Sequence, residues 1–281
     1  MPEGDTVYLS AHRMHDALAG QTLISSDFRL PALAGADVAG RTVLEVVPRG
    51  KHMLMRFDDG RTLHTHFRMD GSWRVYPLGR RWNGGPVHEV RIVLGTESQQ
   101  AVGYRLHDVE LISTANEPRV VGHLGPDLLG PDWDEAEALR RLREQPLREI
   151  APALLDQRNL AGIGNVYKVE VLFLRGLSPW TPVGAVEDLP ALVRLGRRLL
   201  VANKGRWEQV TTGSTRRGEQ HWVYERSGRP CRRCGEPIRG AEQLDPPWLT
   251  RLTYWCARCQ PGPAPAVTGR GVSGGRATGR P

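Results

Sequence analysis

The four cysteines are the feature of this chain that most restricts how it can fold. They form two Cys-x-x-Cys knuckles, Cys231 with Cys234 and Cys256 with Cys259, separated by a stretch of hairpin length. Four thiolates at this spacing match a closed, structural Zn²⁺ site. The alternatives are disulfides, which a reducing cytosol disfavours, and a redox pair, which needs only one knuckle. We expect one structural zinc ion per chain, in a hairpin whose many arginines direct it toward a nucleic-acid backbone.

The hydrophobic pattern changes near the middle of the chain. From Thr22 to about Ile112, short apolar stretches alternate with Gly, Pro and Asp, which predicts an antiparallel β-sandwich or barrel. A helix near Thr6–Ala19 precedes it. Beyond residue 133 the periodicity becomes helical. The predicted helices are Asp134–Arg143, Glu149–Asp156, Val166–Arg175 and Glu187–Val201.

These patterns predict a multi-domain α+β protein. Residues 1–121 would form the β-sandwich domain with its flanking N-terminal helix, and residues 122–133 a Gly- and Pro-rich linker. A helical domain over 134–224 and the zinc hairpin over 225–260 would follow. The tail over 261–281 contains almost no large apolar residue, so we expect a disordered basic segment.

Charge and composition favour an anionic partner. The chain carries a formal net charge of +7 and a pI of about 9.6. Its cations are nearly all arginines, which suit phosphate contacts and base stacking. A GC-rich genome would produce the same arginine bias. No apolar run is long enough to span a membrane and no leader is evident, so we expect a cytoplasmic, nucleoid-associated protein.

The N-terminal residues Pro2 and Glu3 are candidate catalytic residues. If Met1 is removed, the chain begins with the secondary amine of Pro2, and α-amino groups have pKa values of about 7.7–8.0. Such an amine is a nucleophile without special activation, and Glu3 beside it is a candidate proton donor or acceptor. Taken alone, these residues are better explained as an ordinary chain start.

A glycine-containing loop over 154–165 separates two of the predicted helices. Gly162 and Gly164 permit a tight turn and a close backbone approach to a ligand. The helix that begins near Asn165 would present free N–H groups to a phosphate. The alternatives are a dinucleotide-binding loop, for which the third glycine is missing, and a plain turn between helices.

A third group of candidates lies in the β-region. Lys51 follows a glycine turn, and His64 and His66 share one face of a predicted strand. Phe67, Arg68 and Met69 would lie at a loop tip and fill a gap in a base stack. The alternatives are an exposed turn lysine, hydrogen-bonded or metal-binding histidines, and a hairpin with a core-facing methionine.

In combination, these motifs resemble the formamidopyrimidine-DNA glycosylase / endonuclease VIII family, and more closely its endonuclease VIII branch of bacterial, actinobacterial type. The resemblance covers Met1 to Gln260, and Asp156 to Asn165 looks like the family's helix-two-turns-helix element. The motifs that carry it are Pro2-Glu3-Gly4, Arg49-Gly50-Lys51, Leu154-Leu155-Asp156-Gln157 through Gly164-Asn165, and the hairpin ending Tyr254-Trp255-Cys256-Ala257-Arg258-Cys259-Gln260.

The resemblance implies a bifunctional DNA glycosylase and abasic-site lyase. Pro2 would attack C1′ of a damaged nucleoside and form an iminium that promotes β,δ-elimination. Glu3 would protonate the sugar ring oxygen, and Lys51 would contact phosphate and assist as an acid. The residues implied in DNA contact are His66, Arg68, Met69, Asn165 and Arg251, with Met69 and Arg68 filling the gap left by the extruded base.

Two residues depart from the family pattern. Thr6 stands where many relatives have a glutamate, and Asp70 stands where the endonuclease VIII branch often has an aromatic residue. The first removes a candidate proton-relay carboxylate, and the second bears on opposite-base preference. The short segment Thr211 to Val223 disfavours a long lesion-capping loop and favours oxidised pyrimidines as substrates.

The expected partner is damaged DNA, whether duplex, single-stranded or in a bubble, bound by a monomer. One rival function is a non-catalytic protein that binds damaged DNA with the same clamp and hairpin. A second rival, a zinc-ribbon transcription or translation factor, explains the cysteines but nothing before residue 150.

Overall fold

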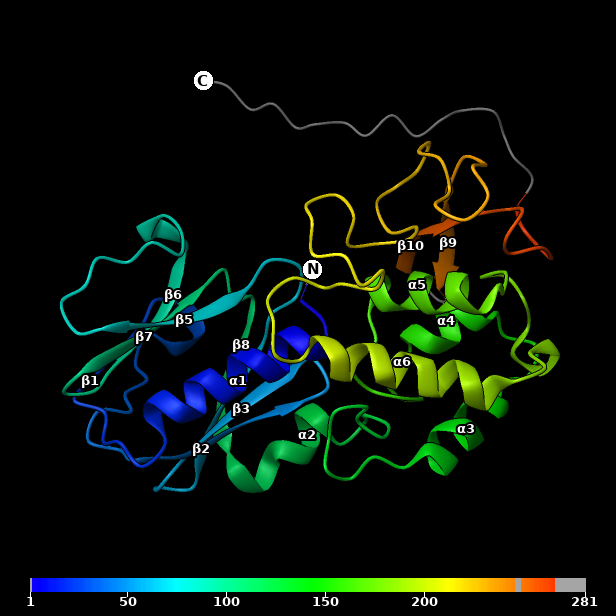
Figure 1. The fold of residues 1–281 in the computed structure, drawn as a ribbon. Helices are drawn as coiled ribbons and strands as arrows, with labels where there is room; N and C mark the ends of the chain where they lie inside the picture. Colours follow the sequence, from blue (N-terminus) through cyan, green and yellow to red (C-terminus); the bar gives the residue numbers. More distant parts are fainter. Residues whose placement is uncertain (1, 246–248, 266–281) are drawn as a thin grey trace.

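The N-terminal half is built from two antiparallel sheets that face each other. We describe residues 2–245 and 249–265 of a computed structural model, shown in Figure 1. One sheet has the strand order β1-β6-β7-β5 and the other β2-β3-β4-β8. The strands are β1 (Ser25–Phe28), β2 (Val43–Arg49), β3 (His52–Phe57), β4 (Arg61–His66), β5 (Ser72–Pro77), β6 (Val90–Gly95), β7 (Gln99–Tyr104) and β8 (Asp108–Ser113).

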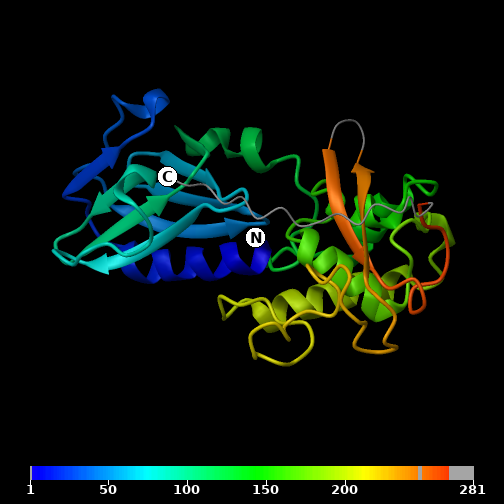
Figure 2. The same cartoon turned by 90° about the horizontal axis from the view of Figure 1, so that it is seen from above.

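One apolar core fills the space between the two sheets and confirms the predicted β-sandwich. Met53 and Phe57 of one sheet belong to the same buried cluster as Trp73 and Ile92 of the other. Helix α1 (Gly4–Leu18) lies along this half of the molecule, as Figure 2 shows. Its apolar residues at helical spacing, from Val7 to Leu18, are buried in that cluster, which explains why the helix forms here.

The second half is helical and has its own core. Its helices are α3 (Glu135–Arg143), α4 (Ile150–Leu155), α5 (Asn165–Arg175) and α6 (Leu189–Asn203), and each begins and ends within two residues of its predicted bounds. The short helix α2 (Glu117–Val121) follows β8, and its Glu117 pairs with Arg56 of β3. The first nine residues of α5 are buried, and the helix ends at Gly176, whose φ of 67° suits glycine. Helix α5 is therefore the central element of this half.

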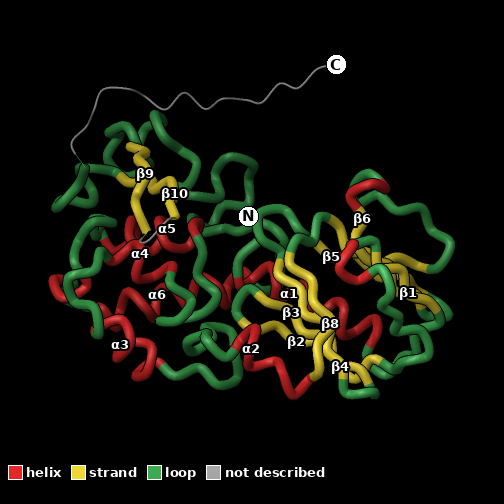
Figure 3. The backbone as a smooth tube through the Cα atoms, turned by 180° about the vertical axis from the view of Figure 1, so that it is seen from behind, coloured by secondary structure: helices red, strands yellow, loops and turns green. Residues whose placement is uncertain are grey.

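A two-stranded hairpin of β9 (Arg239–Asp245) and β10 (Leu249–Trp255) packs on α5. Cys231, Cys256 and Tyr254 share a buried cluster with Val166 and Phe173 of α5. Seen from behind in Figure 3, helices α3 to α6 and the hairpin lie on one side of the N-terminus and the sheets on the other. The N-terminal residues thus lie where the two halves meet.

The segment predicted as a linker is packed in its middle, whereas Gly122, His123, Pro131 and Asp132 are exposed. Leu124 to Leu128 are buried, and the carboxylate of Asp127 accepts hydrogen bonds from Gly50 N at 2.7 Å and Leu129 N at 3.0 Å. The predicted tail lies outside the described residues from position 266 onward. Among the helices of the described ranges, none is both long and apolar enough to cross a membrane.

Candidate active site

The chain start and the loop before α5 are in direct backbone contact. Gly4 N donates to Gly162 O at 2.9 Å, and a Cβ on Gly4 would lie 2.9 Å from the Gly162 Cα. Gln157 shapes this loop, because its side chain donates to Ile163 O at 2.9 Å and accepts from Gly162 N at 3.0 Å. Only glycine permits so close an approach, so these residues join two motifs that are far apart in sequence.

Glu3 is fully buried at the N-terminus of α5. Its carboxylate accepts hydrogen bonds from Gly164 N at 2.7 Å and from Val166 N at 2.6 Å. The helix dipole favours an anion at this position. The expectation that these N–H groups bind a DNA phosphate is therefore wrong, because Glu3 already uses them.

The surroundings of Glu3 favour its protonated form more than water would. Burial raises the pKa of Glu3 to about 7, while the charge of Lys51 opposes that rise and the charge of Asp5 adds to it. A carboxyl group with a pKa near the working pH can both donate and accept a proton during a reaction. Glu3 is thus suited to acid catalysis beside Pro2.

Lys51 is brought to the same place by the turn after β2. Gly50 has a φ of 58°, donates its N–H to Asp127, and lies so close to Ala161 that a Cβ would approach it at 3.0 Å. Lys51 is half-buried, which excludes the alternative of an exposed turn lysine. Burial lowers the pKa of Lys51 to about 8, against the opposing effect of Glu3. Part of the population is therefore a neutral amine near neutral pH.

Pro2 lines a groove of about 920 Å³ between α1, β5 and the segment after α6. This volume falls within the usual range for ligand sites. Thr6 and Trp207 line the same groove. Trp207 is 47% exposed, and the Arg13 guanidinium lies 4.7 Å from its ring centroid. Sequence reasoning missed Trp207, because a lone tryptophan outside any periodic segment carries no signal.

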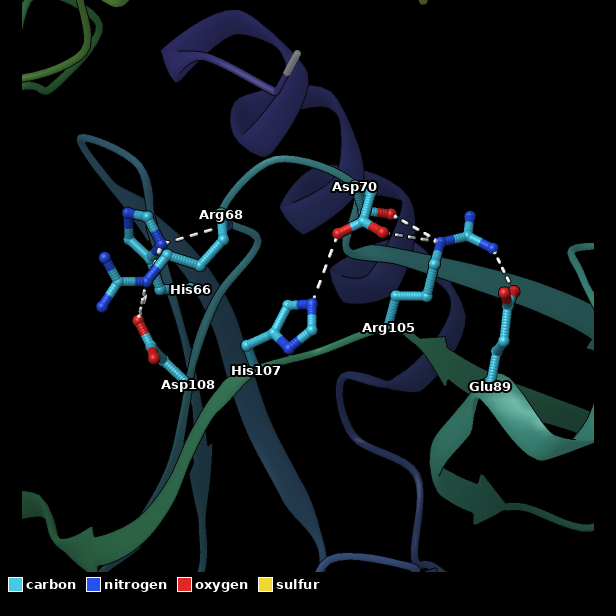
Figure 4. Close-up of polar contacts among 7 residues, drawn as sticks. All are labelled: His66, Arg68, Asp70, Glu89, Arg105, His107 and Asp108. Carbon is cyan, nitrogen blue, oxygen red and sulfur yellow. Dashed lines mark hydrogen bonds and ion pairs between the residues drawn. The ribbon is translucent and has the colours of Figure 1, made fainter. Parts of the chain in front are cut away.

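The loop from Phe67 to Gly71 exposes Met69 at its tip, with 57% of the residue accessible. Phe67 is buried in the sandwich core, so the expectation that it fills a gap in a base stack is wrong. The alternative of a core-facing methionine is wrong as well. Arg68, with a φ of 52°, donates to the Asp108 carboxylate (Figure 4).

Asp70 joins this loop to the segment before β8, as Figure 4 shows. Its backbone O accepts from Arg105 Nε at 3.1 Å, and its carboxylate lies 3.4 Å from His107 Nε2. Arg105 also pairs with Glu89. Asp70 therefore restrains the loop that presents Met69.

His64 and His66 both pack against a third histidine, His52. His52 Nδ1 and His64 Nε2 are 2.8 Å apart, and the His66 ring lies 4.7 Å from the His52 ring. Burial and then the Arg68 charge lower the pKa of His66 to about 4, so it is neutral at pH 7. Over the described ranges, the four cysteines are the only cluster of three or more side chains placed to hold a metal.

Asn165 and Arg251 link α5 and the hairpin to this centre. Asn165 Nδ2 donates to Leu252 O at 2.9 Å, so its amide holds β10 against α5. Arg251 lies half-buried on β10 and is close enough to influence Lys51 electrostatically. The hairpin is thereby attached to the same point as the N-terminal motifs.

The four cysteines can hold one metal ion. None forms a disulfide, and all four Sγ atoms lie within 4.8 Å of one another. Cys231 Sγ is 3.9 Å from Cys259 Sγ, and Cys234 Sγ is 3.5 Å from Cys256 Sγ. Four thiolates around Zn²⁺ at bonds of about 2.3 Å would be about 3.8 Å apart, so the spacing fits.

Comparison with known proteins identifies two domains of one family. Residues 1–111 match the formamidopyrimidine-DNA glycosylase N-terminal domain, and residues 124–189 match the H2TH domain of the same glycosylases. One match lies in each half of the fold, and the two together cover more than half of the chain.

Full-length relatives agree with these matches. A probable endonuclease 8 2 of Streptomyces coelicolor is 56% identical, with 96% of this chain and 98% of the relative covered. A DNA-(apurinic or apyrimidinic site) lyase of Mycolicibacterium smegmatis is 44% identical, with 92% and 99% covered. Endonuclease 8 of Escherichia coli K12 is 31% identical, with 92% and 100% covered.

The fold also matches solved structures. Lactococcus lactis formamidopyrimidine-DNA glycosylase, non-covalently bound to DNA with an AP site, superimposes with a TM-score of 0.76 at 25% identity. The match covers 93% of this chain and 100% of that one.

Proposed function

Because the chain belongs to the formamidopyrimidine-DNA glycosylase and endonuclease 8 family, we propose that it is a DNA repair enzyme, a bifunctional DNA glycosylase and abasic-site lyase that acts through Pro2. The observation that carries this proposal is the buried Glu3 carboxyl, held by α5 next to a proline that lines an open groove. A protein that only binds damaged DNA would not need this carboxyl group, nor the half-buried Lys51 beside it.

Each reacting group has a separate task. The amine of Pro2, once Met1 is removed, attacks C1′ of the damaged nucleoside and displaces the base. Glu3 delivers a proton to the sugar ring oxygen, which opens the ring and leaves an iminium on Pro2. The cationic iminium acidifies the C2′ proton, so the 3′ phosphate and then the 5′ phosphate leave by elimination. Lys51 contacts a phosphate and assists as an acid.

The DNA duplex would be bent around the exposed loop of Met69. Met69 fills the gap left by the extruded base, and Arg68 joins it after leaving Asp108. An exposed ion pair of this kind contributes only about 0–1 kcal/mol, so its release costs little. His66 and Arg251 contact the backbone, and Asn165 supports this grip by holding the hairpin in place.

Oxidised pyrimidines are the proposed substrates. The segment before the hairpin, Thr211 to Val223, is short. Its end is fixed to α5, because the Glu170 carboxylate accepts hydrogen bonds from Trp222 N and Val223 N at 2.8 Å and from Tyr224 N at 2.9 Å. Such a segment does not supply a long flap to cover a purine lesion. One Zn²⁺ bound by the four cysteines would stabilise the hairpin, and the enzyme would act as a monomer on the nucleoid.

A covalent trap tests the proposal. With Met1 confirmed absent by mass, borohydride should reduce the iminium and link the protein to duplex DNA that contains thymine glycol or an abasic site. Peptide mapping should locate the link at Pro2. A protein extended by an N-terminal tag should bind the same DNA without forming the adduct. Absence of an adduct with the untagged protein would rule out this mechanism.

Arg251→Ala should weaken DNA binding and make it less sensitive to salt. Loss of one phosphate contact reduces the slope of log affinity against log salt by about one. Arg143→Ala, the same change at an exposed position on α3, is the control and should leave the slope unchanged. Binding of Arg251→Ala that equals the wild type at both low and high salt would remove Arg251 from the interface.

A further inference from the structure

Asp5 is a buried carboxylate at the reaction centre to which the proposed mechanism gives no task. It lies in the first turn of α1 and is fully inaccessible. Within the described residues it forms no ion pair with a lysine or arginine. Buried carboxylates without a cation are costly, so they are rare away from functional sites.

Two neutral side chains from different parts of the fold hold this carboxylate. Tyr167 Oη, from α5, donates to Asp5 Oδ2 at 2.6 Å, and Gln209 Nε2 donates to Asp5 Oδ1 at 3.0 Å. Both partners donate, which favours the ionised carboxylate. Burial raises the pKa of Asp5, and these two hydrogen bonds oppose that rise.

The bond to Gln209 also fixes the segment that carries Trp207. Asn203 closes this segment, because Val210 N donates to Asn203 Oδ1 at 2.8 Å and Asn203 Nδ2 donates to Val210 O at 2.9 Å. Since Trp207 lines the groove beside Pro2, Asp5 joins α1, α5 and one wall of the groove.

Asp5 also acts on the groups that transfer protons. Its negative charge raises the pKa values of both Glu3 and Lys51. Four charged or titratable groups interact with Glu3: Lys51 from the turn after β2, Asp5 from α1, Tyr167 from α5 and Tyr224 after α6. Two arginines lie one step further out, since Arg251 influences the pKa of Lys51 and Arg206 that of Tyr167. Asp5 is the only carboxylate in this set.

We infer that Asp5 is a positioning residue for the reaction at Pro2: its carboxylate, held by Tyr167 and Gln209, joins α1 to α5, fixes the wall of the groove and places its charge near Glu3. This inference rests on the proposed function. A purely structural role, as an acid that stabilises the start of α1, would require no effect on the protonation of Glu3.

The test is the pH dependence of base excision by Asp5→Asn, measured in single turnovers on thymine glycol DNA. Activity requires protonated Glu3 and should fall at high pH as Glu3 ionises. Removing the charge of Asp5 lowers the pKa of Glu3, so this falling limb should move to lower pH, by up to about one unit. Tyr167→Phe removes a donor that stabilises the charge, so it should move the limb the same way, by less.

Asp58→Asn is the matched control. It makes the same chemical change at an exposed position in the turn between β3 and β4, outside the groove that Pro2 lines. Its falling limb should coincide with that of the wild type. Each variant is also trapped with borohydride on abasic DNA, which verifies folding and the Pro2 chemistry independently.

The outcomes separate the two proposals. If Asp5→Asn and Tyr167→Phe form the trapped adduct but keep the wild-type falling limb, the inference about Asp5 is overturned and the proposed function stands. If the wild type forms no adduct, the proposed function itself fails. A shift of the limb in both variants, with none in Asp58→Asn, supports the inference even if one of the two variants is poorly stable.

Discussion

Glu3→Gln should lower the rate of base excision by about 10²- to 10⁴-fold, the usual contribution of a positioned general acid. Glutamine keeps an oxygen to accept a hydrogen bond from Gly164 or Val166, so the N-terminus of α5 remains capped. It cannot deliver a proton to the sugar ring oxygen. Single-turnover excision of thymine glycol measures this loss directly.

The same variant should separate the two activities of the enzyme. An abasic site already exists in part as an open aldehyde, which Pro2 can attack without protonation of the ring. Strand cleavage at a preformed abasic site should therefore fall much less than excision. The wild-type excision rate should decline above about pH 7, where Glu3 ionises, and this decline should be absent from the residual activity of Glu3→Gln. Excision at the wild-type rate would assign the acid role to another group.

Removal of the metal should abolish DNA cleavage without unfolding the protein. Structural zinc sites of this kind contribute about 10–16 kcal/mol to the folding of their own segment. Cys231 and Cys256 belong to the cluster that packs the hairpin on α5, whereas the sandwich and the helical core have separate clusters. We therefore expect residues 225–260 to unfold locally after chelation, while the helical signal in circular dichroism is largely retained.

Loss of the hairpin removes Arg251 from the DNA and the Leu252 carbonyl from Asn165. DNA affinity should fall by about 100-fold or more, equivalent to about 2.7 kcal/mol. Limited proteolysis should then cut at the arginines between the two knuckles, and added Zn²⁺ should restore both protection and cleavage. Cys256→Ser should reproduce the chelated state and resist rescue by Zn²⁺. A chelated protein that cuts DNA at the normal rate would show that the hairpin is dispensable.

The elements of this fold could be predicted because their signals are local. The apolar spacing of Val7, Met14 and Leu18 defines a helix face, and Gly176 marks the end of α5, since few other residues adopt its backbone conformation. Each expected helix lies within two residues of its observed bounds for this reason. The two cysteine knuckles likewise define a metal site by spacing alone.

The partners of the polar side chains could not be predicted in this way. Phe67 was expected at the loop tip but lies in the core, and the hydrogen bond from Asn165 Nδ2 to Leu252 O was not foreseen. The choice depends on which surfaces meet when the two halves pack, and no local pattern encodes it. The same limit explains why Trp207 and the bond between Asp5 and Tyr167 went unrecognised.

The sequence by itself determined the family, the elements of both halves and the groups available for chemistry, because motifs such as Pro2-Glu3-Gly4 and the cysteine knuckles are continuous in the chain. Only the tertiary structure decided what those groups do to one another. Glu3 meets the N-terminus of α5 across more than 160 residues, and that burial, together with Lys51 and Asp5, brings its pKa to about 7. A proton affinity depends on solvent exclusion and on neighbouring charges, and both arise only when distant segments pack together.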